Sequence, residues 1–153
     1  MNENQTTDDK QPLFALRSQY VKDLSLENPH APASLMAAGQ QAPKVELSID
    51  LAAQKIQDGL FELMMRINVR ALGERTLFMV DLTYAGLFGT ENIPEADLEP
   101  IIMVDGAFIL FPFARRVVAD VTRDGGFPPL LLEPVDFYRF YQEKRAQAEV
   151  ASA

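Results

Sequence analysis

Apolar and polar side chains alternate along four stretches between residues 13 and 88. A period of two is typical of a strand that buries one of its faces. The clearest case is the second stretch, in which Val45, Leu47 and Ile49 share one face. A short turn at Gly73-Glu74 indicates that the last two stretches form a hairpin. The predicted strands are 13–27, 44–50, 60–72 and 76–88. We therefore expect a four-stranded antiparallel sheet with one apolar face.

The first predicted strand separates its side chains into two sets when it is read with strict alternation. The apolar face is predicted to hold Phe14, Leu16, Tyr20, Leu24 and Leu26. The opposite face is predicted to hold Arg17, Gln19, Asp23, Ser25 and Glu27. Because most of this second set is charged, we expect it to face water.

The long helix that follows the strands begins in an acidic segment around Pro94 and Pro100, as is typical of a helix N-terminus. Within it, Pro112 lacks an amide hydrogen and is predicted to kink the axis. The helix is predicted to end near Asp124, with Gly125 in the left-handed conformation. One set of side chains recurs at four-residue steps and predicts a packing face: Phe113, Val117 and Val121.

A last helix is predicted from Asp136, a residue suited to an N-cap. Strands first and helices second indicate an α+β fold. With 153 residues, we expect a single domain over 13–145, between a disordered N-terminal tail at 1–12 and a flexible C-terminal tail at 146–153.

Composition excludes several classes of function. The net charge of −8 argues against nucleic acid and anionic lipid and favours basic partners. The N-terminus does not resemble a secretory signal, and no apolar run reaches the roughly 20 residues that span a bilayer. We therefore expect a cytoplasmic protein without direct membrane insertion.

Candidate catalytic chemistry is sparse. The chain has no cysteine, and its only histidine, His30, lies in a proline-rich loop, so we expect no metal site. No Walker loop or G-x-G-x-x-G is present, and we expect no cofactor. Asp23 and Glu27 share a strand face at roughly 13 Å, which is wider than the spacing of a glycosidase pair. The sequence thus predicts a protein that is not an enzyme.

The segment Phe127–Leu132, FPPLLL, is apolar and stiffened by prolines. Connecting segments usually lie on the surface and are polar. We expect this one to pack on its own core or on a partner.

Three groups of residues together resemble the SecB family of bacterial protein-export chaperones. They are Tyr20–Glu27 with Asn28–Pro32, Leu110–Arg115, and Gly126–Phe137, and the likeness covers Phe14 to Tyr141. The resemblance implies a homotetramer, a dimer of dimers, with helices between paired sheets. It implies ATP-independent holding of unfolded precursor proteins and their delivery to SecA, the motor ATPase of translocation.

The resemblance also assigns candidate residues. The SecA-binding positions would be Asp23, Glu27, Met79 and Asp81. The client-binding positions would be Val45, Leu47 and Ile49, with Phe127, Leu130 and Leu132 as a lid. Three alternatives stay open: a holdase dedicated to a toxin–antitoxin pair, a structural oligomer subunit, and an enzyme with a small apolar pocket.

Overall fold

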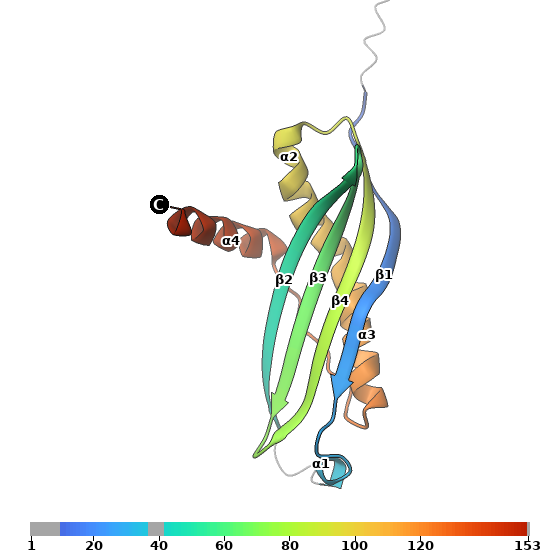
Figure 1. The fold of residues 1–153 in the computed structure, drawn as a ribbon, viewed down its shortest axis with the longest axis vertical. Coiled ribbons are helices and arrows are strands. Elements are labelled where there is room, and N and C mark those ends of the chain that lie inside the picture. The colour runs from blue at the N-terminus through green and yellow to red at the C-terminus, as the bar shows by residue number, and fades with distance from the viewer. Residues whose placement is uncertain (1–9, 37–41, 153) are drawn as a thin grey trace, which may run out of the picture.

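The computed structural model describes residues 10–36 and 42–152 (Figure 1). The strands are β1 Leu13–Glu27, β2 Lys44–Gln57, β3 Leu60–Leu72 and β4 Thr76–Glu91. The helices are α1 Ala33–Met36, α2 Glu95–Pro100, the π-helical segment η1 Ile101–Gly106, α3 Ala107–Asp124 and α4 Phe137–Ala151. The α+β class is confirmed. Residues 1–9 of the predicted N-terminal tail lie outside the described residues.

The four strands form one antiparallel sheet in the order β1-β4-β3-β2. The predicted β3–β4 hairpin is confirmed, and a second tight hairpin joins β2 to β3 at Asp58-Gly59, where Gly59 has φ +74°. β1 and β2 are the two edges of the sheet, so the chain crosses from one edge to the other between them.

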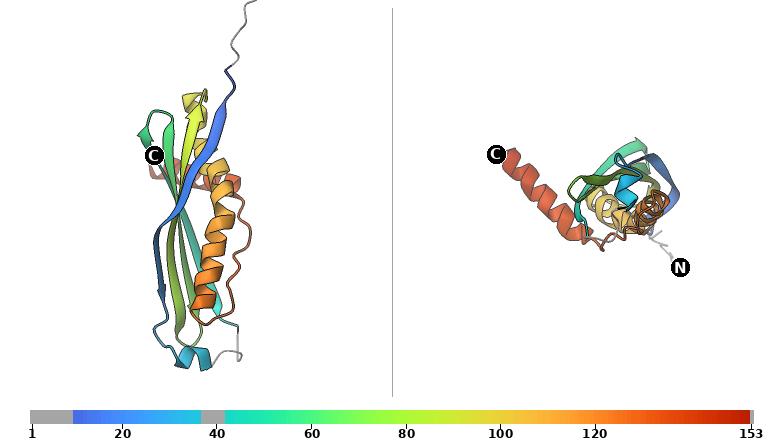
Figure 2. Two further views of the ribbon diagram at one scale, coloured as in Figure 1. Left: turned by 90° about the vertical axis from the view of Figure 1, so that its right-hand side faces the viewer. Right: turned by 90° about the horizontal axis from the view of Figure 1, so that it is seen from below.

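The helices α2, η1 and α3 follow one another along one face of the sheet, which leaves the opposite face uncovered (Figure 2, left). We call these the helix-covered face and the outer face. Leu110, Ala114 and Val118 of α3 are fully buried at four-residue steps against the sheet. The approach is close, because a Cβ on Gly86 of β4 would lie 2.7 Å from Leu110 Cδ2.

The face of α3 differs from the predicted one. Phe113, expected to pack with Val117 and Val121, is 43% exposed, whereas the other two are partly buried against the core. The helix runs unbroken through Pro112, and the irregular π-helical turns lie before it, at η1. A kink at Pro112 stays a prediction.

The end of α3 uses Gly126 rather than Gly125 for the left-handed conformation. Gly125 has φ −73°, and Gly126 has φ +91°. The Gly126 amide donates to the Arg123 carbonyl at 2.9 Å, and the Phe127 amide donates to the Thr122 carbonyl at 3.2 Å. This pair of bonds is a Schellman motif, and it turns the chain back along the helix.

Helix α4 projects from the body of the molecule (Figure 2, right). Its predicted N-cap is confirmed, because Asp136 Oδ1 accepts from the Arg139 amide at 3.2 Å. Tyr141 donates to Glu99 Oε1 at 3.1 Å, and Lys144 Nζ lies 2.7 Å from Asp50 Oδ1, which ties the helix to α2 and β2. The helix continues to Ala151, beyond the predicted domain boundary at 145. Within residues 10–36 and 42–152, no helix is both long and apolar enough to cross a membrane.

Two β-bulges correct the predicted faces of β1. The pairing with β4 shifts between Leu16 and Ser18 and again between Val21 and Asp23. Between these shifts the alternation is inverted, so Tyr20 lies on the outer face and Gln19 on the helix-covered face, the reverse of the prediction. After the second shift, Leu24 and Leu26 return to the helix-covered face and Asp23 and Glu27 to the outer face, as predicted.

β3 has its predicted bounds, while β2 and β4 are longer than predicted. β4 continues past Phe88 to Glu91. β2 continues past Asp50 to Gln57, through Ala52, Ala53 and other residues without an apolar alternation. These positions pair with β3 in regular register up to Lys55, with one shift before Gln57, so the pairing with β3 defines the end of β2.

Candidate functional site

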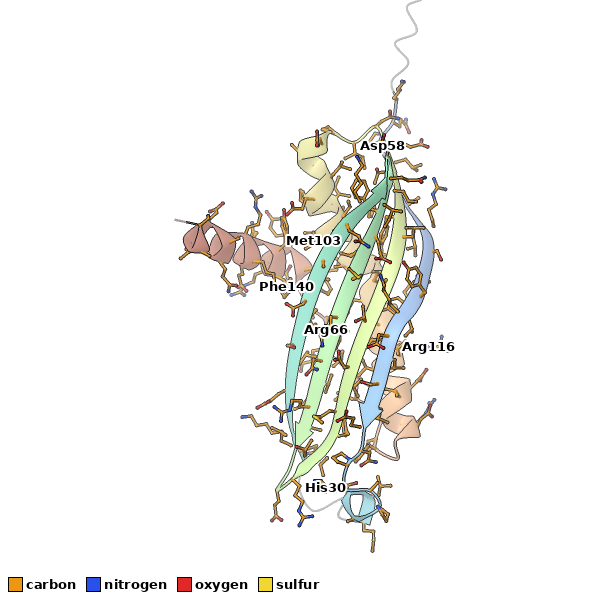
Figure 3. The ribbon with its side chains drawn as sticks, in the orientation of Figure 1. His30, Asp58, Arg66, Met103, Arg116 and Phe140 are labelled. Atoms are coloured by element: carbon orange, nitrogen blue, oxygen red, sulfur yellow. The ribbon has the colours of Figure 1, made fainter. Side chains whose placement is uncertain are left out.

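The outer face carries rows of side chains, all polar except Met79, that cross all four strands. The register aligns Asp23, Thr83, Arg66 and Asp50 in one row. The next rows are Ser25, Asp81, Asn68 and Ser48, and then Glu27, Met79, Arg70 and Glu46. Figure 3 labels Arg66 in the middle of this face. The sheet thus gathers the four predicted SecA-binding residues in three neighbouring rows.

Asp81 is bound within the chain by Arg66. The guanidinium donates from Nε to Asp81 Oδ1 at 3.2 Å and from Nη2 to Oδ2 at 2.8 Å, a two-pronged ion pair. The Arg66 hydrogen bonds hold the pKa of the Asp81 carboxyl below its usual range. Asp23 and Glu27 are exposed and, among the described residues, take part in no ion pair. The face therefore mixes free and paired acids.

A buried carboxylate, Glu62 of β3, lies further along the same face and was not a candidate from the sequence. It is 6% exposed and accepts hydrogen bonds from Tyr20 of β1, from Lys22 Nζ at 2.9 Å and from Gln54 Nε2 at 2.9 Å. These donors lower the pKa of Glu62, the Tyr20 bond most of all, whereas burial and Glu62 raise the pKa of Tyr20 to about 12. The inverted stretch of β1 is what brings Tyr20 here.

The predicted client positions of β2 lie on the helix-covered face, at the free edge of the sheet. Val45 is 40% exposed and Leu47 42% exposed, and Ile49 is partly buried. Val45 pairs with Ala71 and Ala71 with Phe78, whose ring lies 4.7 Å from that of Phe127. Val45 and Phe78 therefore lie in one row of this face, two strand spacings or roughly 10 Å apart, and Phe127 packs on Phe78 at the far end of that row.

The predicted lid is a well-anchored loop. Phe127 and Leu132 are buried in the core, and Leu130 is partly buried against it. Thr122, fully buried on α3, accepts from the Leu130 amide at 2.9 Å, and Arg115 Nε donates to the Leu132 carbonyl at 2.6 Å. Leu131, which was not a candidate, is 62% exposed. In this arrangement Phe127 and Leu132 fix the loop, and Leu131 meets solvent.

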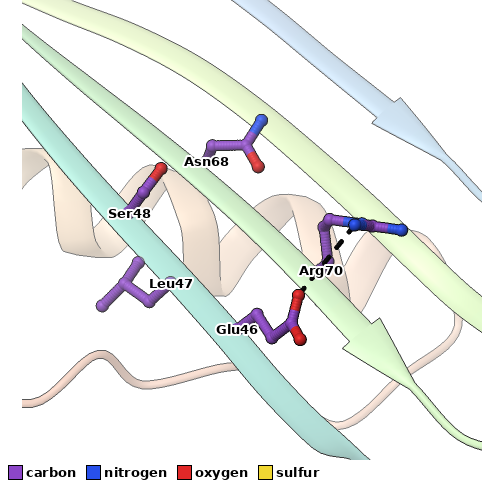
Figure 4. Close-up of a pocket in the computed structure, with 5 residues that line it drawn as sticks. All are labelled: Glu46, Leu47, Ser48, Asn68 and Arg70. Carbon is purple, nitrogen blue, oxygen red and sulfur yellow. Dashed lines mark ion pairs between the residues drawn. The ribbon is translucent and has the colours of Figure 1, made fainter.

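A shallow pocket of about 270 Å³ opens where β2 meets β3 (Figure 4). Its walls are Glu46, Leu47, Ser48, Asn68 and Arg70. Glu46 Oε2 lies 3.9 Å from Arg70 Nη1 across it. Apart from Leu47, these residues belong to the rows of the outer face, so the pocket opens on that face, beside the edge strand β2.

These features define an α+β protein whose sheet offers an exposed apolar strand edge and a charged outer face. The family model described as "Preprotein translocase subunit SecB" matches residues 7–148. The chain belongs to the SecB family.

Similar proteins of known name cover most of the chain. A "Protein-export protein SecB" from Sphingopyxis alaskensis is 46% identical over 143 residues, which are 93% of this chain and 82% of that protein. One from Maricaulis maris is 46% identical over 142 residues, 92% of this chain and 82% of that protein.

A solved structure shows the same fold. It is a SecB-like chaperone of Mycobacterium tuberculosis in complex with a peptide from the HigA1 antitoxin. The TM-score is 0.68 at 21% identity, over 80% of this chain and 90% of that chain.

Proposed function

We propose that this protein is an ATP-independent export chaperone, which holds unfolded precursor proteins in the cytoplasm and delivers them to SecA. Membership of the SecB family and relatives at 46% identity named for protein export support this role. The structural observation that carries it is the apolar side of β2, exposed at a free sheet edge.

Client polypeptide binds along β2, in contact with Val45, Leu47 and Ile49. An extended segment satisfies its backbone along a strand edge and places alternate side chains on the apolar side. Burying one large client side chain there contributes about 1.5–3 kcal/mol. Because apolar contact is non-directional, the site selects unfolded chains without reading a sequence. The loop that Phe127 and Leu132 anchor in the core, with the partly buried Leu130, forms the far wall of this site.

SecA docks on the outer face, at Asp23, Glu27, Met79 and Asp81. The three carboxylates and the net charge of −8 suit a basic partner. Such complementarity acts mainly on association rate and specificity, and it weakens with salt. Because the two surfaces lie on opposite sides of the sheet, client and SecA can be bound together.

The protein acts as a homotetramer. The face of α3 that points away from the sheet carries Phe108, Ile109 and Phe113, which are 48%, 37% and 43% exposed in the single chain. Three large apolar side chains on one exposed helix face are typical of a surface that another subunit covers.

Client holding is tested by Leu47→Arg, with Ile56→Arg as the matched control. Both residues lie on β2 with similar exposure, 42% and 49%, but Ile56 lies at the far end of the strand. A charge at position 47 removes the apolar contact, so we expect about tenfold weaker binding of a slow-folding unfolded protein. Light scattering of client aggregation measures the effect.

Two results would contradict the proposed client site. Unchanged suppression of aggregation by the Leu47→Arg variant would exclude this edge as the binding surface. Equal losses in the two variants would mean that any added charge on β2 acts non-specifically.

The dedicated toxin–antitoxin holdase is the weaker candidate. The chaperone solved with an antitoxin peptide is only 21% identical to this chain, so the likeness supports the fold alone. Relatives at 46% identity are named for export.

A further inference from the structure

Arg66 is surrounded by acids from three different strands. It pairs with Asp81 of β4, faces Asp50 across the β2–β3 pairing, and shares its row with Asp23 of β1. Asp81 first, and then Asp50 and Asp23 at longer range, raise the pKa of Arg66. One guanidinium therefore lies in the middle of the acidic part of the outer face.

The three carboxylates proposed to meet SecA are not equally available. Asp23 and Glu27 are exposed. The Asp81 side chain is only 30% exposed and has both oxygens on Arg66, whose own side chain is 62% exposed. A basic group that approaches this face thus meets two free acids and one that already has a cation.

We propose that Arg66 is an internal competitor for Asp81, which a basic partner must displace when it docks. This rests on the docking face proposed above. The guanidinium is exposed enough to rotate into solvent, and an exposed ion pair is worth at most a factor of about five in an equilibrium constant. Displacement is therefore easy for a partner that also engages Asp23 and Glu27. A single cation that replaces Arg66 at Asp81 gains little binding free energy, because one ion pair is exchanged for another. Arg66 therefore makes the face selective for an extended basic surface.

The test is Arg66→Gln, with Arg70→Gln as the matched control. Both residues lie on β3, face outward and lose one positive charge, but Arg70 has only a distant partner, Glu46, at 3.9 Å. Calorimetric titration with SecA of the same organism is expected to show about twofold to fivefold tighter binding for Arg66→Gln, and a smaller gain for Arg70→Gln. A gain in affinity is not an effect that damage to the fold produces.

A double-mutant cycle separates displacement from a general change in charge. Asp81→Asn is measured in the natural chain and in the Arg66→Gln background. If Arg66 must leave Asp81 on docking, Asp81→Asn costs more affinity in the Arg66→Gln background. Equal costs, or a gain no larger than that of Arg70→Gln, would overturn the competitor role while leaving the docking face in place. If neither Asp81→Asn nor Asp23→Asn changes SecA binding in either background, the docking face itself is wrong, and the competitor role with it.

Discussion

At the scale of single residues, Glu62 illustrates how a sheet can keep a buried acid charged. Burial alone disfavours a carboxylate, but Tyr20, Lys22 and Gln54 supply donors to both of its oxygens. The three donors come from β1 and β2, the two edges of the sheet, and meet on β3 between them. One carboxylate therefore links both edges across the outer face.

Glu62→Gln is expected to lower the free energy of unfolding at pH 7 by about 1–3 kcal/mol, because a neutral amide cannot accept from all three donors. The folded chain holds the pKa of Glu62 below its ordinary value of 4.5. Its stabilisation is thus present above pH 4.5 and is lost as the pH falls through the lowered folded pKa.

Urea unfolding across this acid range measures the effect. The natural chain should lose stability on acidification, and the Glu62→Gln variant should lose less. Glu46→Gln, which alters an exposed acid with a partner at 3.9 Å, is the control and should follow the natural chain. Parallel curves for all three proteins would contradict the assigned role of Glu62.

At the scale of elements, Thr122 joins helix α3 to the loop that follows it. Its hydroxyl donates within the helix, to the carbonyls of Val118 at 2.9 Å and Ala119 at 3.0 Å, and accepts from the Leu130 amide. The Schellman turn at Gly126 reverses the chain so that this bond can form. One buried hydroxyl therefore helps to position the loop, together with Arg115 and the buried side chains of Phe127 and Leu132.

Thr122→Val removes the acceptor for the Leu130 amide while keeping the shape of the side chain. We expect a loss of about 1–3 kcal/mol in the free energy of unfolding and faster hydrogen exchange at that amide. Thr122→Ser, which keeps the hydroxyl, should protect the Leu130 amide. Equal exchange in the two variants would show that the hydroxyl does not hold the loop.

The helices and strands also show which parts of the fold can be predicted from the sequence. The bounds of β1 and β3 follow from alternation, and the cap at Asp136 follows from residue type. Tyr20 was assigned to the wrong face because a bulge adds a residue without leaving a mark in a simple apolar–polar pattern. The missed end of β2 had a signal, since Asp58-Gly59 is a typical hairpin turn.

The candidate site likewise has features that the sequence could predict and features that it could not. Asp23, Met79 and Asp81 could be assigned to one face because alternation and family likeness agree there. The Arg66–Asp81 pair could not, since a diagonal contact depends on the register between β3 and β4. The exposure of individual residues could not be predicted from the sequence either. In the segment FPPLLL, the tertiary packing alone determines that Leu132 is buried and Leu131 is exposed.

At the scale of the whole molecule, the single chain leaves an apolar face on α3 uncovered. Phe113→Glu places a charge in this face, and we expect it to convert a species of four times 17.1 kDa into smaller ones. Size-exclusion chromatography with light scattering measures the mass. Met36→Glu, at an 84% exposed apolar residue on α1, is the control and should remain tetrameric. Unchanged assembly of the Phe113→Glu variant would exclude this face as the subunit contact.

The bulges of β1 have a consequence for self-association. A fibre grows by edge-to-edge pairing only if every copy has two sheet edges that can pair with a further strand. A strand interrupted by β-bulges pairs poorly with a further strand. β1 is interrupted in two places, whereas β2 pairs with β3 without a register shift from Lys44 to Lys55. Only the β2 edge can readily accept an added strand, so each copy offers a single edge for pairing, and pairing between copies could not continue beyond two. The protein can thus keep the β2 edge accessible to unfolded polypeptides without assembling into a fibre.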